Sequence, residues 1–193
     1  MSVYIYSKTD TDVSCFEEII GLLRDTEKEM QFITENRRSY RECCNMINSL
    51  ASSDVIVVRS LSDLGGNMSD IVERLDAILV KGNVLVVSDI PTTYTYGIQQ
   101  PMNKAILETV RQTIVSNHPN VLAMRQKPSV GRNRIEFPDN WGELYEKWLM
   151  HEITSKEFIK ESGLKKATFY NLLTEYRTIQ KINNEYIKKY NPA

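Results

Sequence analysis

Residues 54–87 read DVIVVRSLSDLGGNMSDIVERLDAILVKGNVLVV, with two apolar runs on either side of a helical pattern. The runs Asp54–Arg59 and Val84–Val87 are rich in valine and isoleucine, as buried strands are. Between them, Asn67–Lys81 repeats apolar residues at helical spacing, and Gly82 is the expected left-handed cap at its end. A strand, a helix and a second strand in succession predict two parallel strands joined by a crossover helix.

The same alternation continues on both sides of this unit. Two more strands are expected at Val3–Ser7 and Met30–Thr34, and three more helices at Thr11–Arg24, Tyr40–Leu50 and Met102–Val115. Pro119 should stop the last helix, because proline removes a hydrogen-bond donor and clashes with the preceding turn. The expected fold class is therefore α/β, with a parallel sheet and helices on both of its faces over residues 1–127.

A second, all-α domain is expected after this sheet. Residues 128–138, PSVGRNRIEFP, hold two prolines and a glycine without apolar periodicity, which is typical of a linker or an extended arm. Helical patterns follow at Trp141–His151, Ser155–Glu161 and Lys165–Arg177. We therefore expect a small helical domain over residues 139–193.

Composition bounds the classes of protein that this chain can belong to. Of its 193 residues, 41% are hydrophobic and 25% charged, which is ordinary for a globular protein. Three cysteines without CxxC spacing, and a lone His118 at the end of a helix, indicate neither a disulfide framework nor a metal site. We expect no cofactor. Neither a membrane span nor a signal peptide is apparent, so a cytoplasmic protein is expected.

The C-terminal helices have the pattern of a helix-turn-helix. Thr154 and Glu157 form a capping-box pattern, and Gly163 permits the turn before the second helix. The second helix should pack through four apolar side chains, Leu164, Phe169, Leu172 and Leu173. Five polar or aromatic residues remain for the outer side and are the candidate DNA contacts, namely Lys165, Lys166, Thr168, Tyr170 and Asn171.

These residue types suit recognition of double-stranded DNA. Lysines contact phosphates, and an asparagine such as Asn171 can pair with adenine in the major groove. Upstream, Arg132 and Arg134 form a basic arm that could enter a neighbouring minor groove. From residue 131 onward the chain carries 11 basic and 9 acidic residues, net +2, against 13 and 16, net −3, before it. The alternative is a three-helix bundle that binds protein, with its lysines merely solvated.

The whole chain resembles the resolvase/invertase branch of the serine recombinases. VYIYSKT at residues 3–9 lies where that family has a strand of the form GYARVST, DVIVVRSLSDLGGN at 54–67 where it has a strand leading into LDRLGRS, and VGRNR at 130–134 where an arm precedes the helix-turn-helix. The resemblance implies a serine that attacks a DNA phosphodiester, an arginine-rich site around the phosphate, and dimerisation through a long helix. Here that helix is interrupted near Pro119.

At the catalytic positions the chain departs from the family. In this alignment the serine becomes Lys8 and the arginine of the first strand becomes Tyr6. The signature becomes Leu61–Gly66, with the degenerate positions Ser62, Asp63 and Gly66, and only Arg41 matches an active-site arginine. The site loses two units of positive charge relative to the family. Phosphoryl transfer depends on preorganised positive charge, so we expect no catalysis.

Ser7 is the one candidate that could rescue the chemistry. It is adjacent to the expected position, but side chains alternate faces along a strand, so its hydroxyl should point to the opposite side. The simpler interpretation is a serine that caps the end of the strand.

Three functions follow from these patterns. The first is an inactive recombinase relative that binds DNA as a dimer or higher oligomer, associated with the nucleoid or a plasmid, and regulates transcription or shapes DNA; a related active recombinase is a further candidate partner. The second is an active, divergent site-specific recombinase. The third is a protein-interaction adaptor without a DNA role.

Overall fold

The chain divides into two compact units. The computed structural model describes residues 2–24, 29–96, 98, 100–124 and 135–190. The first unit comprises Met1–Pro128 together with Ile179–Ala193, and the second comprises Ser129–Thr178. Arg132 and Arg134, the candidate arm residues, lie outside the described residues.

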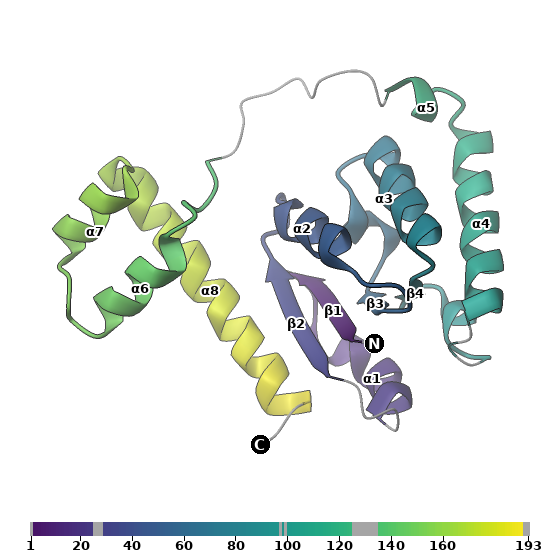
Figure 1. Cartoon of the computed structure of the whole chain (residues 1–193), viewed down its shortest axis with the longest axis horizontal. Helices are drawn as coiled ribbons and strands as arrows, with labels where there is room; N and C mark the ends of the chain where they lie inside the picture. The colour runs from purple at the N-terminus through teal and green to yellow at the C-terminus, as the bar shows by residue number, and fades with distance from the viewer. Residues whose placement is uncertain (1, 25–28, 97, 99, 125–134, 191–193) are drawn as a thin grey trace. The chain divides into compact units, whose positions relative to one another are not determined.

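The first unit is built on a four-stranded parallel sheet (Figure 1). Its strands are β1 (Val3–Lys8), β2 (Met30–Glu35), β3 (Val55–Val58) and β4 (Val84–Val87), in the spatial order β2-β1-β3-β4. All three neighbouring pairs are parallel. The order reverses direction between β1 and β3, and the carboxyl ends of strands at such a reversal are where open α/β sheets bind ligands. The expected parallel sheet is confirmed.

Helices cover both faces of this sheet, as the sequence predicts. One face packs against α2 (Arg41–Ser49), α3 (Met68–Lys81) and α4 (Gln100–Asn117). The other packs against the 3-10 turn Val13–Phe16 and α1 (Glu17–Arg24). Alternation along the strands sorts the side chains between the two apolar clusters.

The helix boundaries follow the capping residues. Asn67 accepts a hydrogen bond from the backbone of Asp70 at the start of α3, and Gly82 ends the helix at φ 70°. Helix α4 ends at Asn117, and the short α5 (Val121–Met124) follows Pro119, so the predicted interruption is confirmed. Short 3-10 turns lie at Leu61–Leu64 (η2) and Pro91–Thr93 (η3).

The second unit consists of α6 (Trp141–Leu149), α7 (Ser155–Ser162) and the first part of α8 (Lys166–Tyr190). Thr154 and Glu157 form the expected capping box, and Gly163 ends α7 at φ 68°. The buried side chains of this unit are Trp141, Leu144, Phe158, Phe169, Leu172 and Leu173. The predicted packing face of the last helix is therefore confirmed, and the partly buried Tyr145 and Trp148 join the same core, as expected.

Helix α8 is longer than the sequence pattern suggests. It was expected to end near Arg177, but it continues to Tyr190 and has 25 residues. Its sequence holds no glycine or proline that would stop it. The last part of α8 packs in the apolar cluster of the sheet, so residues 179–193 belong to the first unit, unlike the single 139–193 domain expected. Among the described helices, none combines the length and apolarity that crossing a bilayer requires.

Candidate functional site

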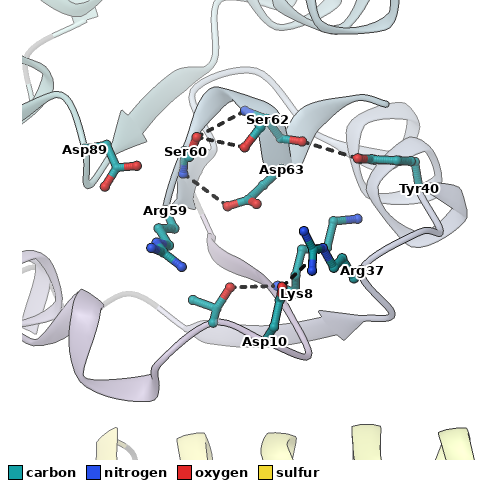
Figure 2. Close-up of a pocket in the computed structure, with 10 residues that line it drawn as sticks. Lys8, Asp10, Arg37, Tyr40, Arg59, Ser60, Ser62, Asp63 and Asp89 are labelled. Atoms are coloured by element: carbon teal, nitrogen blue, oxygen red, sulfur yellow. Dashed lines mark hydrogen bonds and ion pairs between the residues drawn. The ribbon is translucent and has the colours of Figure 1, made fainter. Parts of the chain in front are cut away.

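A polar hollow of about 370 Å³ lies at the carboxyl ends of β1 and β3 (Figure 2). Its lining comes from the last residue of β1 and from the segments that follow the four strands, namely Lys8, Asp10, Thr11, Arg37, Tyr40, Arg59, Ser60, Ser62, Asp63 and Asp89. Three of the degenerate positions predicted from the sequence, Lys8, Ser62 and Asp63, thus lie together around one cavity.

Lys8 is buried at the floor of this hollow. Only 3% of its surface is exposed, and its ammonium group donates to the Tyr6 hydroxyl at 2.5 Å and to the carbonyl of Ser39. The same nitrogen lies 3.8 Å from the centre of the Tyr40 ring, a cation–π contact. Burial lowers the pKa of the Lys8 ammonium below its ordinary value, against the opposing effect of the nearby Glu35. Lys8 therefore ties the β2–α2 loop to the end of β1.

Glu35 completes this buried network and was not identified from the sequence. It stands opposite Lys8 in the β1–β2 register, is 3% exposed, and lies 3.7 Å from the Lys8 nitrogen. Tyr6 donates its hydroxyl proton to Glu35 at 2.6 Å. The backbone amides of Glu42 and Cys43, in the first turn of α2, also donate to this carboxylate. Burial and the Glu35 charge raise the pKa of the Tyr6 hydroxyl far above its usual value.

Asp63 faces the hollow from the turn η2. Its carboxylate accepts the backbone N–H of Ser60 at 3.1 Å, and the Ser60 side chain caps the same turn (Figure 2). Burial raises the pKa of the Asp63 carboxyl above its usual value. Ser62 is exposed, and its hydroxyl lies 2.9 Å from that of Ser60.

Two arginines also line the hollow, and sequence reasoning missed both. Arg37 follows β2 and lies 3.4 Å from the carboxylate of Asp10, while Arg59 directly follows β3 and is exposed. Asp89, after β4, adds a further carboxylate. The lining is therefore of mixed charge, not simply acidic. Their position in the sequence could have identified them, because a charged residue shortly after a strand lies at the edge where parallel strands end and where open α/β sheets bind ligands.

The remaining predicted positions lie elsewhere. Ser7 is 1% exposed, and its hydroxyl contacts that of Thr34 at 3.1 Å, so it lies away from the hollow, as strand alternation predicts. Arg41 begins α2 and is not among the residues that line the hollow. Tyr6 is fully buried beneath it.

Two glycines, Gly65 and Gly66, follow η2, and close packing explains the first of them. A Cβ on Gly65 would lie 2.7 Å from Asp70 Cβ and 2.8 Å from the backbone nitrogen of Ile71. The Arg74 guanidinium also packs here, donating to the Leu64 carbonyl and, at 3.1 Å, to the sulfur of Cys44. Gly66 is less confined, since its nearest neighbour, Tyr40, would lie 3.4 Å from an added Cβ.

The candidate DNA contacts lie together at the start of α8. Lys165, Lys166, Tyr170 and Asn171 are exposed, and Thr168 is half-buried. The intervening Phe169 is fully buried, so this part of α8 has a packed side and a solvent side. The solvent side offers two ammonium groups, a phenol and an amide, which are groups that proteins use to contact phosphates and base edges.

No cluster of three or more His, Cys, Asp or Glu side chains that could hold a metal ion is found within the described ranges. The hollow is instead lined by the exposed Ser62 and the half-buried Ser60, and by Arg37 and Arg59.

Comparison with known families identifies the first unit. A search of curated proteins finds no match. Residues 14–134 match the family described as Resolvase, N terminal domain. The matched segment begins after β1, so Tyr6, Ser7 and Lys8 are not part of it. It nevertheless covers more than half of the 193 residues, and the chain belongs to the resolvase family of serine recombinases.

Proposed function

We propose that this protein is a catalytically inactive serine recombinase relative that binds double-stranded DNA through the start of α8, as a regulator of transcription or a DNA-architectural factor. It works as a homodimer or higher oligomer, and a related active recombinase is a candidate partner. The observation that carries the proposal is Lys8, which occupies the position aligned with the nucleophile and is buried in a network of hydrogen bonds.

The chemistry of that network argues against strand cleavage. A nucleophile must reach the phosphorus atom and needs a base or a lowered pKa for activation. Lys8 is engaged by Tyr6 and Ser39, and Ser7, its neighbour, is buried against Thr34. Asp63 adds a carboxylate where the family resemblance places an arginine, and a carboxylate repels a phosphate.

The helical unit supports the DNA-binding part of the proposal. Its core is built from apolar residues that leave Lys165, directly before α8, and Lys166 and Asn171, in its first turns, exposed to solvent. Gly163, in the left-handed conformation, ends α7 before this segment, and the turn of a helix-turn-helix often contains such a glycine.

Selection of duplexes from a random-sequence pool tests this proposal. We expect enrichment of a specific sequence and an affinity that falls steeply with salt, because bound lysines release counterions from DNA. The double variant Lys165→Ala/Lys166→Ala should lower the slope of log affinity against log salt by about one unit per lysine. Lys181→Ala/Lys188→Ala, which removes two exposed lysines later in α8, is the matched control and should keep the slope. An unchanged slope in the first variant would show that other residues contact the phosphates, and failure of the original protein to enrich any duplex would favour the adaptor function.

The active alternative also has one observation in its favour. Ser62 is an exposed hydroxyl in a hollow that Arg37 and Arg59 also line, so a nucleophile and two cations share the cavity. In that case Ser62→Ala should abolish strand exchange while leaving DNA binding intact.

A further inference from the structure

Arg59 and Asp89 lie next to each other at the polar hollow. The backbone N–H of Asp89 donates to the carbonyl of Arg59 at 2.9 Å, which continues the β3–β4 ladder beyond the two strands. Both side chains are exposed and line the hollow (Figure 2). Within the described ranges, neither side chain has a hydrogen-bond or ion-pair partner. A guanidinium and a carboxylate are therefore available to a ligand at this edge of the sheet.

The other two cations of the lining already have carboxylate partners. Lys8 lies 3.7 Å from Glu35, and Arg37 lies 3.4 Å from Asp10. The first pair is almost fully buried and the second is exposed. In each pair the two charges cancel, so neither pair contributes a net charge to the hollow.

Asp63 adds a second carboxylate without a cation in contact with it. It accepts the backbone N–H of Ser60 at 3.1 Å, and no side chain in the described part of the chain forms an ion pair with it. Figure 2 shows this carboxylate directed into the hollow. Because burial raises the pKa of the Asp63 carboxyl, its charged form is stabilised by any cation placed beside it. The charges that remain for a ligand are one guanidinium, Arg59, and two carboxylates, Asp63 and Asp89.

The complement of these three groups is a small molecule with one carboxylate and two cations. A guanidinium binds a carboxylate through two parallel hydrogen bonds, and each protein carboxylate attracts a cationic group. A phosphate would instead meet two carboxylates and a single guanidinium. The volume of about 370 Å³ lies in the range of roughly 300–1,000 Å³ that is typical of small-molecule pockets.

We propose that the hollow binds a basic amino acid, L-arginine or L-lysine, with Arg59 at its α-carboxylate and Asp63 and Asp89 at its two cationic groups. This inference goes beyond the proposed function, because it concerns the sheet unit alone and requires no DNA. The location agrees with it, since the strand order reverses between β1 and β3, and open α/β sheets bind small ligands at the carboxyl ends of such strands.

Isothermal titration calorimetry of the full chain with L-arginine and with L-lysine tests this inference. We expect one ligand to bind per chain. L-citrulline has nearly the shape of L-arginine without the side-chain charge, and agmatine is the same molecule without the carboxylate. Each should bind roughly tenfold more weakly than L-arginine, because each lacks one charged hydrogen-bonding group. Inorganic phosphate should not compete with L-arginine.

Variants of the lining test which residue contacts which group of the ligand. Arg59→Gln should weaken L-arginine binding roughly tenfold without weakening agmatine binding, because agmatine has no carboxylate for Arg59 to bind. Retained agmatine binding also shows that this variant is folded. Asp89→Asn should weaken the binding of both ligands, since both carry the two cations. Arg38→Gln and Glu73→Gln remove exposed charges outside the lining and are the matched controls, which should bind as the original protein does.

The inference is wrong if neither L-arginine nor L-lysine binds at concentrations up to about 10 mM. It is also wrong if L-citrulline and agmatine bind as tightly as L-arginine, or if either Arg59→Gln or Asp89→Asn binds L-arginine with unchanged affinity. Binding of inorganic phosphate that L-arginine does not displace would overturn it in favour of an anion site. None of these outcomes bears on DNA binding, which the selection of duplexes tests separately.

Discussion

Lys8 loses most of its hydration because it is buried at the polar hollow. Hydrogen bonds and a nearby carboxylate compensate for the loss of water. The ammonium group donates to Tyr6 and Ser39 and lies near the Glu35 carboxylate, which the first amides of α2 also bind. A buried charge persists only where such partners replace water. At the residue scale, Lys8 connects β1 with β2 and with the loop before α2 through buried polar contacts.

Removing the charge of Lys8 should therefore cost stability. Lys8→Met leaves the Glu35 carboxylate buried without its cation, and we expect a loss of about 3 kcal/mol in the free energy of unfolding. Urea denaturation measures it. The double variant Lys8→Met/Glu35→Gln should lose less free energy of unfolding than the sum of the losses in the two single variants, because the two residues interact. Lys104→Met, which removes an exposed partner of Glu108, is the control and should cost less than about 0.5 kcal/mol. A Lys8 variant as stable as this control would contradict the structural role.

Cys43 should make the fold sensitive to alkali. Burial raises the pKa of the Cys43 thiol to about 12 from an ordinary 9.0. The folded chain holds this proton when the unfolded chain has lost it, so the stability from the buried thiol is intact below pH 9.0 and is lost as pH rises toward about 12. Cys43→Val should flatten the fall in urea midpoint across that window. Cys44→Val, at the neighbouring half-buried position, should keep the fall; equal profiles for the two variants would refute the assignment.

At the scale of elements, the turn after η2 depends on close backbone packing against α3. Gly65→Ala would bring its Cβ within 2.7 Å of Asp70 Cβ, and Asp70 is fixed in the first turn of α3. We expect a loss of about 1–3 kcal/mol, typical of overpacking. Gly66→Ala, whose Cβ would meet Tyr40 at 3.4 Å, should cost less. Thermal denaturation of the pair tests this, and a greater loss for Gly66→Ala would show the packing to be misjudged.

The sheet was predictable because its strands and helices have local patterns. Apolar runs such as Val55–Val58, and caps such as Gly82, define elements without information from distant parts of the chain. The tail of α8 was not predictable, since Tyr186 meets Phe32, which is far away in sequence. Polar residues between Ile182, Tyr186 and Tyr190 also resemble a solvated surface when their partner face is unknown.

The hollow could be predicted only in part, for a related reason. Lys8, Ser62 and Asp63 were identified because the sequence resemblance aligns them with motif residues of the family. Glu35 was missed because the predicted strand ended one residue early, at Thr34, and its importance comes from its register opposite Lys8. Arg37 and Arg59 follow different strands, and only the strand order brings them to the same edge.

At the scale of the whole molecule, the proposed function assigns DNA binding to the helical unit and the loss of catalysis to the sheet unit. The resolvase family model matches residues 14–134, and buried contacts engage the end of β1. The helical unit keeps an exposed basic segment at the start of α8. The proposed DNA contacts and the proposed loss of chemistry therefore involve different residues, and variants can test each without altering the other.

The most direct measurement is to incubate the protein with its enriched duplex and then separate the two under denaturing conditions, followed by intact-mass analysis. Quantitative binding measured in parallel on the same sample ensures that the complex has formed. We predict an unmodified protein mass and unbroken DNA strands. A protein joined to a DNA fragment through a serine phosphodiester would contradict the account and establish an active recombinase.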